Sequence, residues 1–464
     1  MNRRDLLVIG AGPAGMAAAA KAVKLGLTVT VLDEQPRAGG QIYRDVERAA
    51  KARGAILGKD YVYGASLAAE MRESEIEYLS GSSVWAIEDG FRVSYTRDGS
   101  GAQIEADRIL LATGALERPM PLPGWTLPGV MTAGAGQILL KQSGVLARRA
   151  VLVGTGPLLY LIAAQMVRAG TPPLALVETQ TRSDFIRATR HLGGALRGWR
   201  YLAKGLTMLA AIRRAGVPRF TGATDISVEG QDRAEAVVFT CAGRERRIEC
   251  ETVFLHHGVV PNVQAARSLD IPHEWRADQA CFVPQLDGWG ESPVAGVFIA
   301  GDGAGIGGAK VAEIAGRLAV LKIAEAAGRL SVKERDQGAA PLRRMIRQEL
   351  AARPFLDLAY PPFAGALAPV DETIICRCEE VTAGDIRSAA KLGCLGPNQA
   401  KSFSRAGMGP CQGRYCGLTV TTLLAEANGQ TADQTGYYRI RPPLKPVTLG
   451  ELAAMSVTEP VGKE

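Results

Sequence analysis

Residues 6–34 read LLVIGAGPAGMAAAAKAVKLGLTVTVLDE, and residues 150–178 read AVLVGTGPLLYLIAAQMVRAGTPPLALVE. The two segments align without gaps at an offset of 144 residues, so that Gly10 meets Gly154. Each contains an apolar run, a glycine turn, an apolar helical segment that ends at a glycine, and a second apolar run that ends in an acid. This order predicts a βαβ unit that occurs twice in the chain.

The first copy carries a complete dinucleotide-binding loop, G-x-G-x-x-G, between its strand and its helix. The first glycine permits a tight turn, the second lets the backbone approach a pyrophosphate, and the third lets the helix pack closely on the strand. The free N–H groups of the helix N-terminus are expected to bind the phosphates. The predicted loop residues are Gly10, Gly12, Pro13, Ala14 and Gly15.

An acid about 20 residues after this loop is expected to bind the ribose hydroxyls of the dinucleotide. Asp33 lies 18 residues beyond Gly15 and is favoured by this spacing. The internal repeat instead aligns Glu34 with Glu178. Both acids therefore remain candidates.

The second copy is altered at its third glycine, which is replaced by Leu159 and followed by Tyr160. A large side chain at this position moves the helix away from the strand or fills the nucleotide space. Glu178 at the end of the second strand would favour an unphosphorylated ribose. We favour a Rossmann-like domain without bound NAD over one that binds it.

Two later strands end in short glycine motifs, at residues 108–114 (RILLATG) and 296–303 (GVFIAGDG). Both motifs resemble signatures of two-dinucleotide flavoproteins, in which the chain leaves the FAD domain, forms the NAD domain and returns. The resemblance implies tandem Rossmann-like domains with bound FAD, in which Asp302 bonds the ribityl chain and a turn at residues 39–41 lies near the isoalloxazine. The residues that it implies are Gly40, Gln41, Ala112, Thr113, Gly114, Gly301 and Asp302.

Disulfide reductases of this fold use a redox-active cysteine pair close to the flavin. Cys241, Cys250 and Cys281 form no C-x-x-C or similar pair. We interpret them as buried or incidental thiols. The chain is not expected to be a disulfide reductase.

Four other cysteines lie near the C-terminus, as C-x-C (Cys376, Cys378) and C-x4-C (Cys411, Cys416) with 32 residues between the pairs. Thiolates are soft ligands that suit iron–sulfur clusters or zinc. The first pair and the 32-residue spacing resemble the small helical bacterioferritin-associated-ferredoxin-like module, which holds [2Fe–2S] and closes with C-x2-C. The resemblance implies a [2Fe–2S] site, with zinc or no metal as the alternatives, and Cys394 outside it.

The net charge and the apolar runs of the sequence indicate which partners and which location to expect for the chain. The formal net charge is +7, and between Arg182 and Arg214 there are eight Lys or Arg residues and one acid. We interpret this run as a solvated helix face or a docking face for an acidic partner, because no nucleic-acid-binding module accompanies it. No signal peptide and no uninterrupted apolar span is evident. We expect a cytoplasmic protein, free or associated with the inner membrane face.

The segments 31–44 (VLDEQPRAGGQIYR), 376–382 (CRCEEVT) and 439–452 (RIRPPLKPVTLGEL) extend the resemblance to nearly the whole chain. It resembles the α (A) subunit of heteromeric flavin-dependent amino-acid and amine dehydrogenases, a group with opine oxidases, D-hydroxyproline dehydrogenase and hydrogen cyanide synthase B-type subunits. This resemblance implies an electron-transferring subunit without catalytic acid or base. A D-amino-acid-oxidase-like β subunit oxidises the amino acid, opine or secondary amine.

The same resemblance implies that electrons pass through FAD and [2Fe–2S] to an acceptor or quinone chain. Some relatives hold FMN between the subunits, and some add a small ferredoxin-like γ subunit. Two alternatives remain: a stand-alone NAD(P)H-dependent flavin and iron–sulfur reductase, and a non-catalytic scaffold that holds ADP or ATP and zinc. The expected domains are the FAD-binding domain (1–146 and 266–330), a degenerate NAD(P)-binding-like domain (147–265), a linker (331–370), the [2Fe–2S] domain (371–428) and a tail (429–464).

Overall fold

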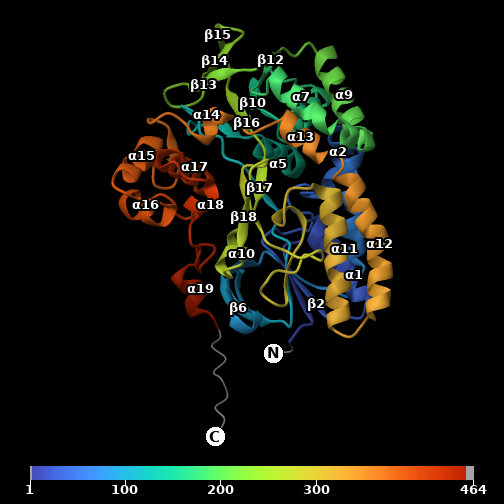
Figure 1. Ribbon diagram of the computed structural model, residues 1–464. Coiled ribbons are helices and arrows are strands. Elements are labelled where there is room, and N and C mark those ends of the chain that lie inside the picture. The colour runs from blue at the N-terminus through green and yellow to red at the C-terminus, as the bar shows by residue number, and fades with distance from the viewer. Residues whose placement is uncertain (1–2, 456–464) are drawn as a thin grey trace.

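The computed structural model describes residues 3–455 and contains two five-stranded parallel sheets, one in each half of the dinucleotide-binding region (Figure 1). The strand orders are β20-β7-β1-β2-β3 and β9-β16-β10-β11-β12, so corresponding strands hold the same positions. This match confirms the predicted α/β fold of tandem Rossmann-like domains. The strands of the first sheet are β1 (Leu6–Ile9), β2 (Val29–Asp33), β3 (Glu77–Ser80), β7 (Ile109–Leu111) and β20 (Val297–Ile299); those of the second are β9 (Val130–Thr132), β10 (Ala150–Gly154), β11 (Ala175–Glu178), β12 (Arg219–Thr221) and β16 (Thr252–His256).

Each parallel sheet is accompanied by a three-stranded antiparallel sheet, inserted before the strand that returns to the centre. A short antiparallel pair, β8 with β17, connects the two halves, and β18 pairs with β19 beside it. The chain therefore leaves the first domain, builds the second and returns. These strands are β4 (Ser83–Glu88), β5 (Arg92–Arg97), β6 (Ser100–Glu105), β8 (Ala115–Glu117), β13 (Thr224–Glu229), β14 (Ala236–Cys241), β15 (Arg244–Glu249), β17 (Val259–Pro261), β18 (His273–Arg276) and β19 (Cys281–Pro284).

Small residues let two long helices approach each other in the first domain. Helix α1 (Pro13–Lys24) begins with proline at its first turn and is rich in alanine, and α11 (Ala309–Ala326) packs against it. A Cβ atom on Gly316 would lie 2.2 Å from the carbonyl oxygen of Ala14. The backbone of α11 therefore lies directly on α1, which no larger residue at position 316 permits.

The C-terminal module packs on the first domain instead of standing apart from it. One continuous apolar cluster joins Ile9 and Leu111 of the first sheet to Ile375 and Leu423 of the module. The segment expected as a linker, residues 331–370, contains three helices of its own, α12, α13 and α14. The elements from there to the end are α12 (Val332–Glu349), α13 (Arg353–Ala359), α14 (Ala364–Leu367), β21 (Ile374–Cys376), β22 (Val381–Thr382), α15 (Ala383–Lys391), α16 (Pro397–Ser404), α17 (Gly417–Asn428), α18 (Ala432–Thr435) and α19 (Leu449–Ala453).

Most of the remaining helices lie along the outer faces of the two domains, whereas α5 and α10 lie toward the centre of the view (Figure 1). Within residues 3–455, no helix is both long enough and apolar enough to cross a membrane. These helices are α2 (Val46–Leu57), α3 (Lys59–Val62), α4 (Gly64–Arg72), α5 (Ala133–Ser143), α6 (Pro157–Arg168), α7 (Arg182–Ala188), α8 (Leu192–Arg197), α9 (Trp199–Arg214) and α10 (Gln264–Ser268).

The contact between α1 and α11 predicts that Gly316→Ala lowers the free energy of unfolding by about 1–3 kcal/mol, because the two backbones must move apart. Chemical denaturation of the purified protein measures this change. Gly205→Ala is the matched control, since it also lies inside a helix and a Cβ there would meet no atom within 4 Å. It is expected to leave stability unchanged or raise it by up to about 1 kcal/mol. Equal effects of the two substitutions would contradict the contact.

Candidate functional site

The first glycine loop has the geometry that a bound pyrophosphate needs. Gly10 has φ +103°, and a Cβ there would lie 2.6 Å from the carbonyl oxygen of Ala112. A Cβ on Gly15 would lie 1.9 Å from the oxygen of Gly10. The space beside Gly12 is open up to the Cα of Gly40 at 3.9 Å, and no side chain caps the N-terminus of α1. The first N–H groups of α1 are therefore free to bind phosphate.

The two acids at the end of β2 have different surroundings. Asp33 is buried, and its carboxylate accepts hydrogen bonds from the backbone N–H groups of Ala11 and Gln35. Burial raises the pKa of Asp33 against the effect of these bonds. Glu34 is exposed and pairs with Lys445 at 2.9 Å. Asp33 thus lies at the glycine loop, whereas Glu34 contacts the C-terminal segment.

The two later glycine motifs meet the first loop. A Cβ on Gly303 would lie 3.4 Å from the carbonyl oxygen of Gly114, and one on Gly301 would lie 3.0 Å from the Cβ of Ala14. The Oδ1 atom of Asp302 accepts hydrogen bonds from the two N–H groups that lead into α11. The structure therefore brings the predicted FAD-binding residues to one end of the first sheet, with Ala112 and Thr113 between the end of β7 and Gly114.

The turn expected near the isoalloxazine is supported by a buried lysine that the sequence did not reveal. A Cβ on Gly40 would lie 2.8 Å from the Cα of Gly12, so this turn lies against the glycine loop. The Nζ of Lys141 donates a hydrogen bond to the carbonyl oxygen of Gln41 at 3.1 Å and lies 5.6 Å from the ring centre of Tyr61. Burial lowers the pKa of Lys141 to about 7.

In the second copy, side chains of the protein itself make the hydrogen bonds of Glu178, the acid that would bind a ribose. Glu178 is fully buried. Its carboxylate accepts hydrogen bonds from the hydroxyl of Tyr160, from Gln180 at 2.7 Å and from the Nε of Arg219 at 2.8 Å. The ring of Tyr160 also packs edge-to-face against Tyr360 from the C-terminal half, with 6.0 Å between centroids. Arg219 therefore neutralises the charge of Glu178, and the hydrogen bonds of this carboxylate are made within the chain.

The two adjacent histidines at the end of β16 have different partners. The Nδ1 of His256 lies 2.6 Å from Glu117, whose second oxygen accepts the N–H of Gly134 at 2.7 Å. His257 is buried, with Nε2 2.7 Å from a backbone oxygen and Nδ1 accepting the N–H of Phe363. Burial lowers the pKa of His257 well below its usual value, so His257 is a neutral structural residue. No sequence pattern points to the Glu117–His256 pair, because the two residues are 139 positions apart.

The four cysteines of the predicted cluster site lie close enough to shift one another's pKa values. The Cys416 thiol lowers the pKa of Cys376. Burial raises the pKa of Cys378, and Cys411 and Cys376 raise it further; Cys376 and Cys411 also raise the pKa of Cys416. The pKa of Cys376 falls to about 6, first because of the Cys416 thiol and then because three backbone N–H groups point at its sulfur. Within residues 3–455, no three His, Cys, Asp or Glu side chains converge as ligands of one metal ion.

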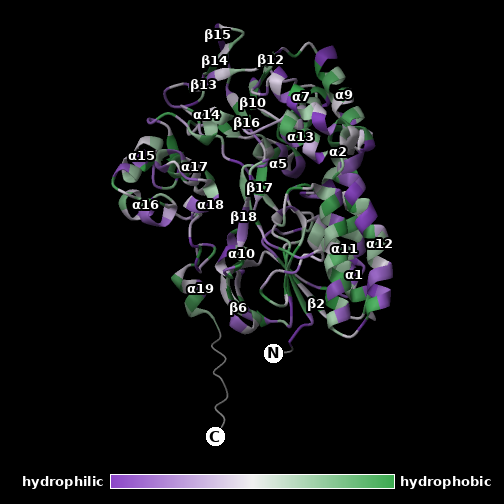
Figure 2. Cartoon of the chain, in the orientation of Figure 1, coloured by the Kyte–Doolittle hydropathy of each residue, from purple (hydrophilic) through white to green (hydrophobic). Residues whose placement is uncertain are grey.

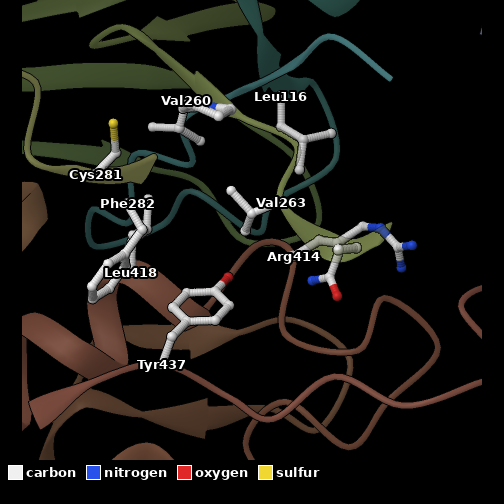
Figure 3. Close-up of a pocket in the computed structure, with 10 residues that line it drawn as sticks. Leu116, Val260, Val263, Cys281, Phe282, Arg414, Leu418 and Tyr437 are labelled. Atoms are coloured by element: carbon white, nitrogen blue, oxygen red, sulfur yellow. The ribbon is translucent and has the colours of Figure 1, made fainter. Parts of the chain in front are cut away.

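The seam between the C-terminal module and the interdomain strands is closed. Figure 3 shows Arg414 and Tyr437 of the module facing Leu116, Val260 and other residues of that seam. The cavity between them has a volume of about 20 Å³, which holds little more than one water molecule. The seam has no room for a flavin.

A three-residue segment joins the first site to the cysteine module. The N–H of Asn262 donates to the oxygen of Gly114 at 3.0 Å, and the side chain of Gln264 donates to the backbone oxygen of Gln412 at 3.3 Å. Three residues span at most ~10 Å. The Gly114 loop is therefore separated from the Cys411 loop by this short segment and its two hydrogen bonds.

A family model described as pyridine nucleotide-disulphide oxidoreductase matches residues 4–328. The chain belongs to this family. A second model, the sarcosine oxidase A3 domain, matches residues 371–456. The chain is thus an oxidoreductase of the flavoprotein class, as the sequence predicted. The eight cysteines are free in the structure.

Relatives extend the similarity over almost the whole chain. The A subunit of opine oxidase from Rhizobium meliloti is 43% identical over 98% of this chain and 88% of its own length. Its counterpart of the same name from Agrobacterium tumefaciens (strain Ach5) is 44% identical, over 98% of this chain and 92% of its own length. The HcnB subunit of hydrogen cyanide synthase from Pseudomonas aeruginosa is 31% identical, over 96% and 97% respectively. These relatives are named as subunits, so the chain belongs to a family of multi-subunit enzymes.

The crystal structure of L-proline dehydrogenase from P. horikoshii has a similar fold. It aligns with a TM-score of 0.71 at 18% identity and covers 97% of this chain and 79% of that one. This likeness confirms the fold.

The buried Glu178 network predicts that Glu178→Gln lowers the free energy of unfolding by about 2 kcal/mol, because charge-assisted hydrogen bonds to Arg219 and Tyr160 are lost. Glu229→Gln removes the carboxylate of an exposed pair with Arg247 at 3.0 Å and is expected to cost less than about 0.5 kcal/mol. Urea denaturation compares the two. Equal losses would show that the Glu178 network is not a buried structural pair.

The lowered pKa of Lys141 predicts a pH dependence of stability. The usual pKa of a lysine is 10.5. Between pH 7 and pH 10.5 the unfolded chain therefore binds more protons than the folded one, so the free energy of unfolding rises with pH. Lys141→Met removes this effect. The stability of the wild type relative to this variant is expected to rise on the order of 1 kcal/mol per unit from pH 7 to pH 9. Denaturation at several pH values measures it, with Lys51→Met as the exposed control. A wild-type and Lys141→Met difference that stays constant over this range would contradict it.

Proposed function

We propose that this chain is the electron-transferring α subunit of a heteromeric dehydrogenase that oxidises an amino acid, an opine or a secondary amine. The observation that carries the proposal is the 43–44% identity to the A subunit of opine oxidase along almost the entire chain. The alpha subunit of sarcosine oxidase from Rhizobium meliloti, 26% identical over 97% of this chain and 42% of its own length, supports the same substrate class. A D-amino-acid-oxidase-like β subunit supplies the electrons in this proposal.

The cofactor proposed for the first site is FAD, which accepts two electrons and passes them on singly. The open space at Gly12 and the uncapped start of α1 fit its pyrophosphate. Asp33 is the proposed ribose ligand, because it lies at the loop while Glu34 is paired with Lys445. Asp302 is proposed for the ribityl chain and the turn at Gly40 and Gln41 for the ring. The full proposed set is Gly10, Gly12, Pro13, Ala14, Gly15, Asp33, Gly40, Gln41, Ala112, Thr113, Gly114, Gly301 and Asp302.

The cofactor proposed for the cysteine module is a [2Fe–2S] cluster, a one-electron carrier. Each iron of such a cluster takes two protein ligands, so the cluster needs four thiolates in one place. The effects of Cys376, Cys378, Cys411 and Cys416 on one another's pKa values fit this requirement. Three backbone N–H groups directed at Cys376 would stabilise its thiolate form.

The route proposed between the two cofactors runs along residues 262–264, whose hydrogen bonds join the Gly114 loop to Gln412. The acceptor beyond the cluster is another electron carrier or a quinone chain. FMN held between the α and β subunits, a cytoplasmic location and a small ferredoxin-like γ subunit complete the proposal. It keeps the domain order predicted from the sequence, except that β9 (Val130–Thr132) joins the sheet of the second domain.

The competing function is that of a stand-alone NAD(P)H-dependent reductase. The engagement of Glu178 by Arg219 and Tyr160 leaves the second domain without a free ribose ligand at this position, which supports the subunit function instead. NADH added to the purified protein under anaerobic conditions is therefore expected to leave the flavin absorbance unchanged. Rapid bleaching of the flavin band by NADH would contradict the proposal.

The two-cofactor proposal predicts about two iron atoms and two acid-labile sulfides per flavin in the purified protein. Cys376→Ser and Cys411→Ser are expected to lose most of the iron and the visible cluster spectrum while they retain the flavin. Cys250→Ser, which alters a buried thiol outside the module, is the matched control and keeps both. Bound zinc in place of iron, or full iron content in Cys376→Ser, would overturn the cluster assignment.

A further inference from the structure

The outer face of the second domain carries an unusual concentration of exposed apolar side chains. Seven of the 22 large apolar side chains that are exposed within residues 3–455 lie between positions 185 and 206, on α7, α8 and α9. Ile186 is 70% exposed, Leu206 68% and Trp199 61%. Isolated exposed apolar residues need no explanation, but a cluster of this size on one set of helices marks an interaction site. We call this face the α7–α9 surface; its apolar residues are Phe185, Ile186, Leu192, Leu196, Trp199, Tyr201 and Leu206.

Helix α9 is apolar on two opposite faces. Met208 and Ile212 are buried against the chain, and the hydroxyl of the half-exposed Tyr201 bonds to Glu349 of α12. On the other side, Trp199 and Leu206 are seven positions apart, which places them in line along one face. An ordinary surface helix is polar on the face away from the core. The outer face of α9, with Trp199 and Leu206, is therefore suited to contact an apolar environment outside the chain.

Arginines surround this stripe and most have no acidic partner. The segment 182–214 contains eight Lys or Arg residues and one acid. That acid, Asp184, is buried and bonded to Arg187, while Lys204 pairs with Asp60. Among the described residues, no ion pair forms with the other six. They are Arg182, Arg190, Arg197, Arg200, Arg213 and Arg214.

The α7–α9 surface lies far from the cysteine module. Figure 1 shows α7 and α9 on one side of the molecule and α15 to α17 on the other. Figure 2 shows hydrophobic and hydrophilic residues intermixed along α7 and α9 instead of segregated. Leu196 precedes Arg197 and Trp199 precedes Arg200 in the sequence. Apolar side chains and guanidinium groups are thus presented together, on a face that leaves the cysteine module free.

We propose that the α7–α9 surface binds the protein peripherally to an anionic phospholipid bilayer. The unpaired arginines are complementary to lipid phosphates, and Trp199, Leu206 and Ile186 are of a size and type to enter the boundary between head groups and acyl chains. A bilayer surface offers negative charge and apolar depth over its whole area, which suits alternating apolar and basic residues. The inference is independent of the proposed function, because it needs neither cofactor.

The experiment is flotation of the purified full-length protein with vesicles of phosphatidylcholine alone or of phosphatidylcholine with phosphatidylglycerol. Binding is expected only with phosphatidylglycerol and is expected to weaken as salt is raised. The triple variant Arg197→Gln, Arg200→Gln, Arg213→Gln is expected to bind on the order of 100-fold more weakly, from about fivefold per charge. Leu206→Glu is expected to abolish binding at low protein concentration.

Matched controls carry the same chemical changes on the far side of the molecule. Leu392→Glu alters a leucine that is 70% exposed on the cysteine module, and Lys391→Gln, Arg439→Gln, Arg441→Gln removes the same charge there. Both are expected to bind vesicles like the wild type. The proposal is overturned if the wild type does not bind anionic vesicles, which would assign the surface to a protein partner. It is also overturned if the controls lose binding as the α7–α9 variants do.

Discussion

The fold depends on backbone contacts that only glycine permits at the start of α1. A Cβ on Gly15 would meet the oxygen of Gly10 at 1.9 Å, and one on Gly316 would meet the oxygen of Ala14 at 2.2 Å. These contacts hold β1, α1 and α11 in direct backbone contact. They also fix the position of Gly12, beside which the space for a pyrophosphate stays open. The first domain and its site are therefore consequences of the same close packing.

The two copies of this unit differ at the acid that ends their second strand. The second sheet has the same strand order as the first, yet Tyr160 and Arg219 satisfy Glu178 in the place where a ribose would be recognised. A charged group that is buried must be paired, and here the pairing is internal. The second domain thereby serves as a structural base for α7 to α9 on one side and for the interdomain strands on the other.

The sequence was sufficient for the parts of the molecule that local patterns determine. The repeated βαβ units follow from the glycine spacing and apolar periodicity of residues 6–34 and 150–178. Lys141 beside Gln41 and Glu117 beside His256 were not predictable, because each contact joins residues 100 or more positions apart. The sequence left both Asp33 and Glu34 as candidate ribose ligands. The fold adds their different neighbours in space, on which the proposal of Asp33 rests.

The C-terminal segment has a consequence for the order in which the protein is made. Lys445 pairs with Glu34 across 411 positions, and the N–H of Leu444 bonds to the oxygen of Trp85. During synthesis, the last helix of the first domain, α11 (Ala309–Ala326), is made more than 100 residues before this segment. The edge of the first domain next to Glu34 is therefore the last part of that domain to be covered by the chain.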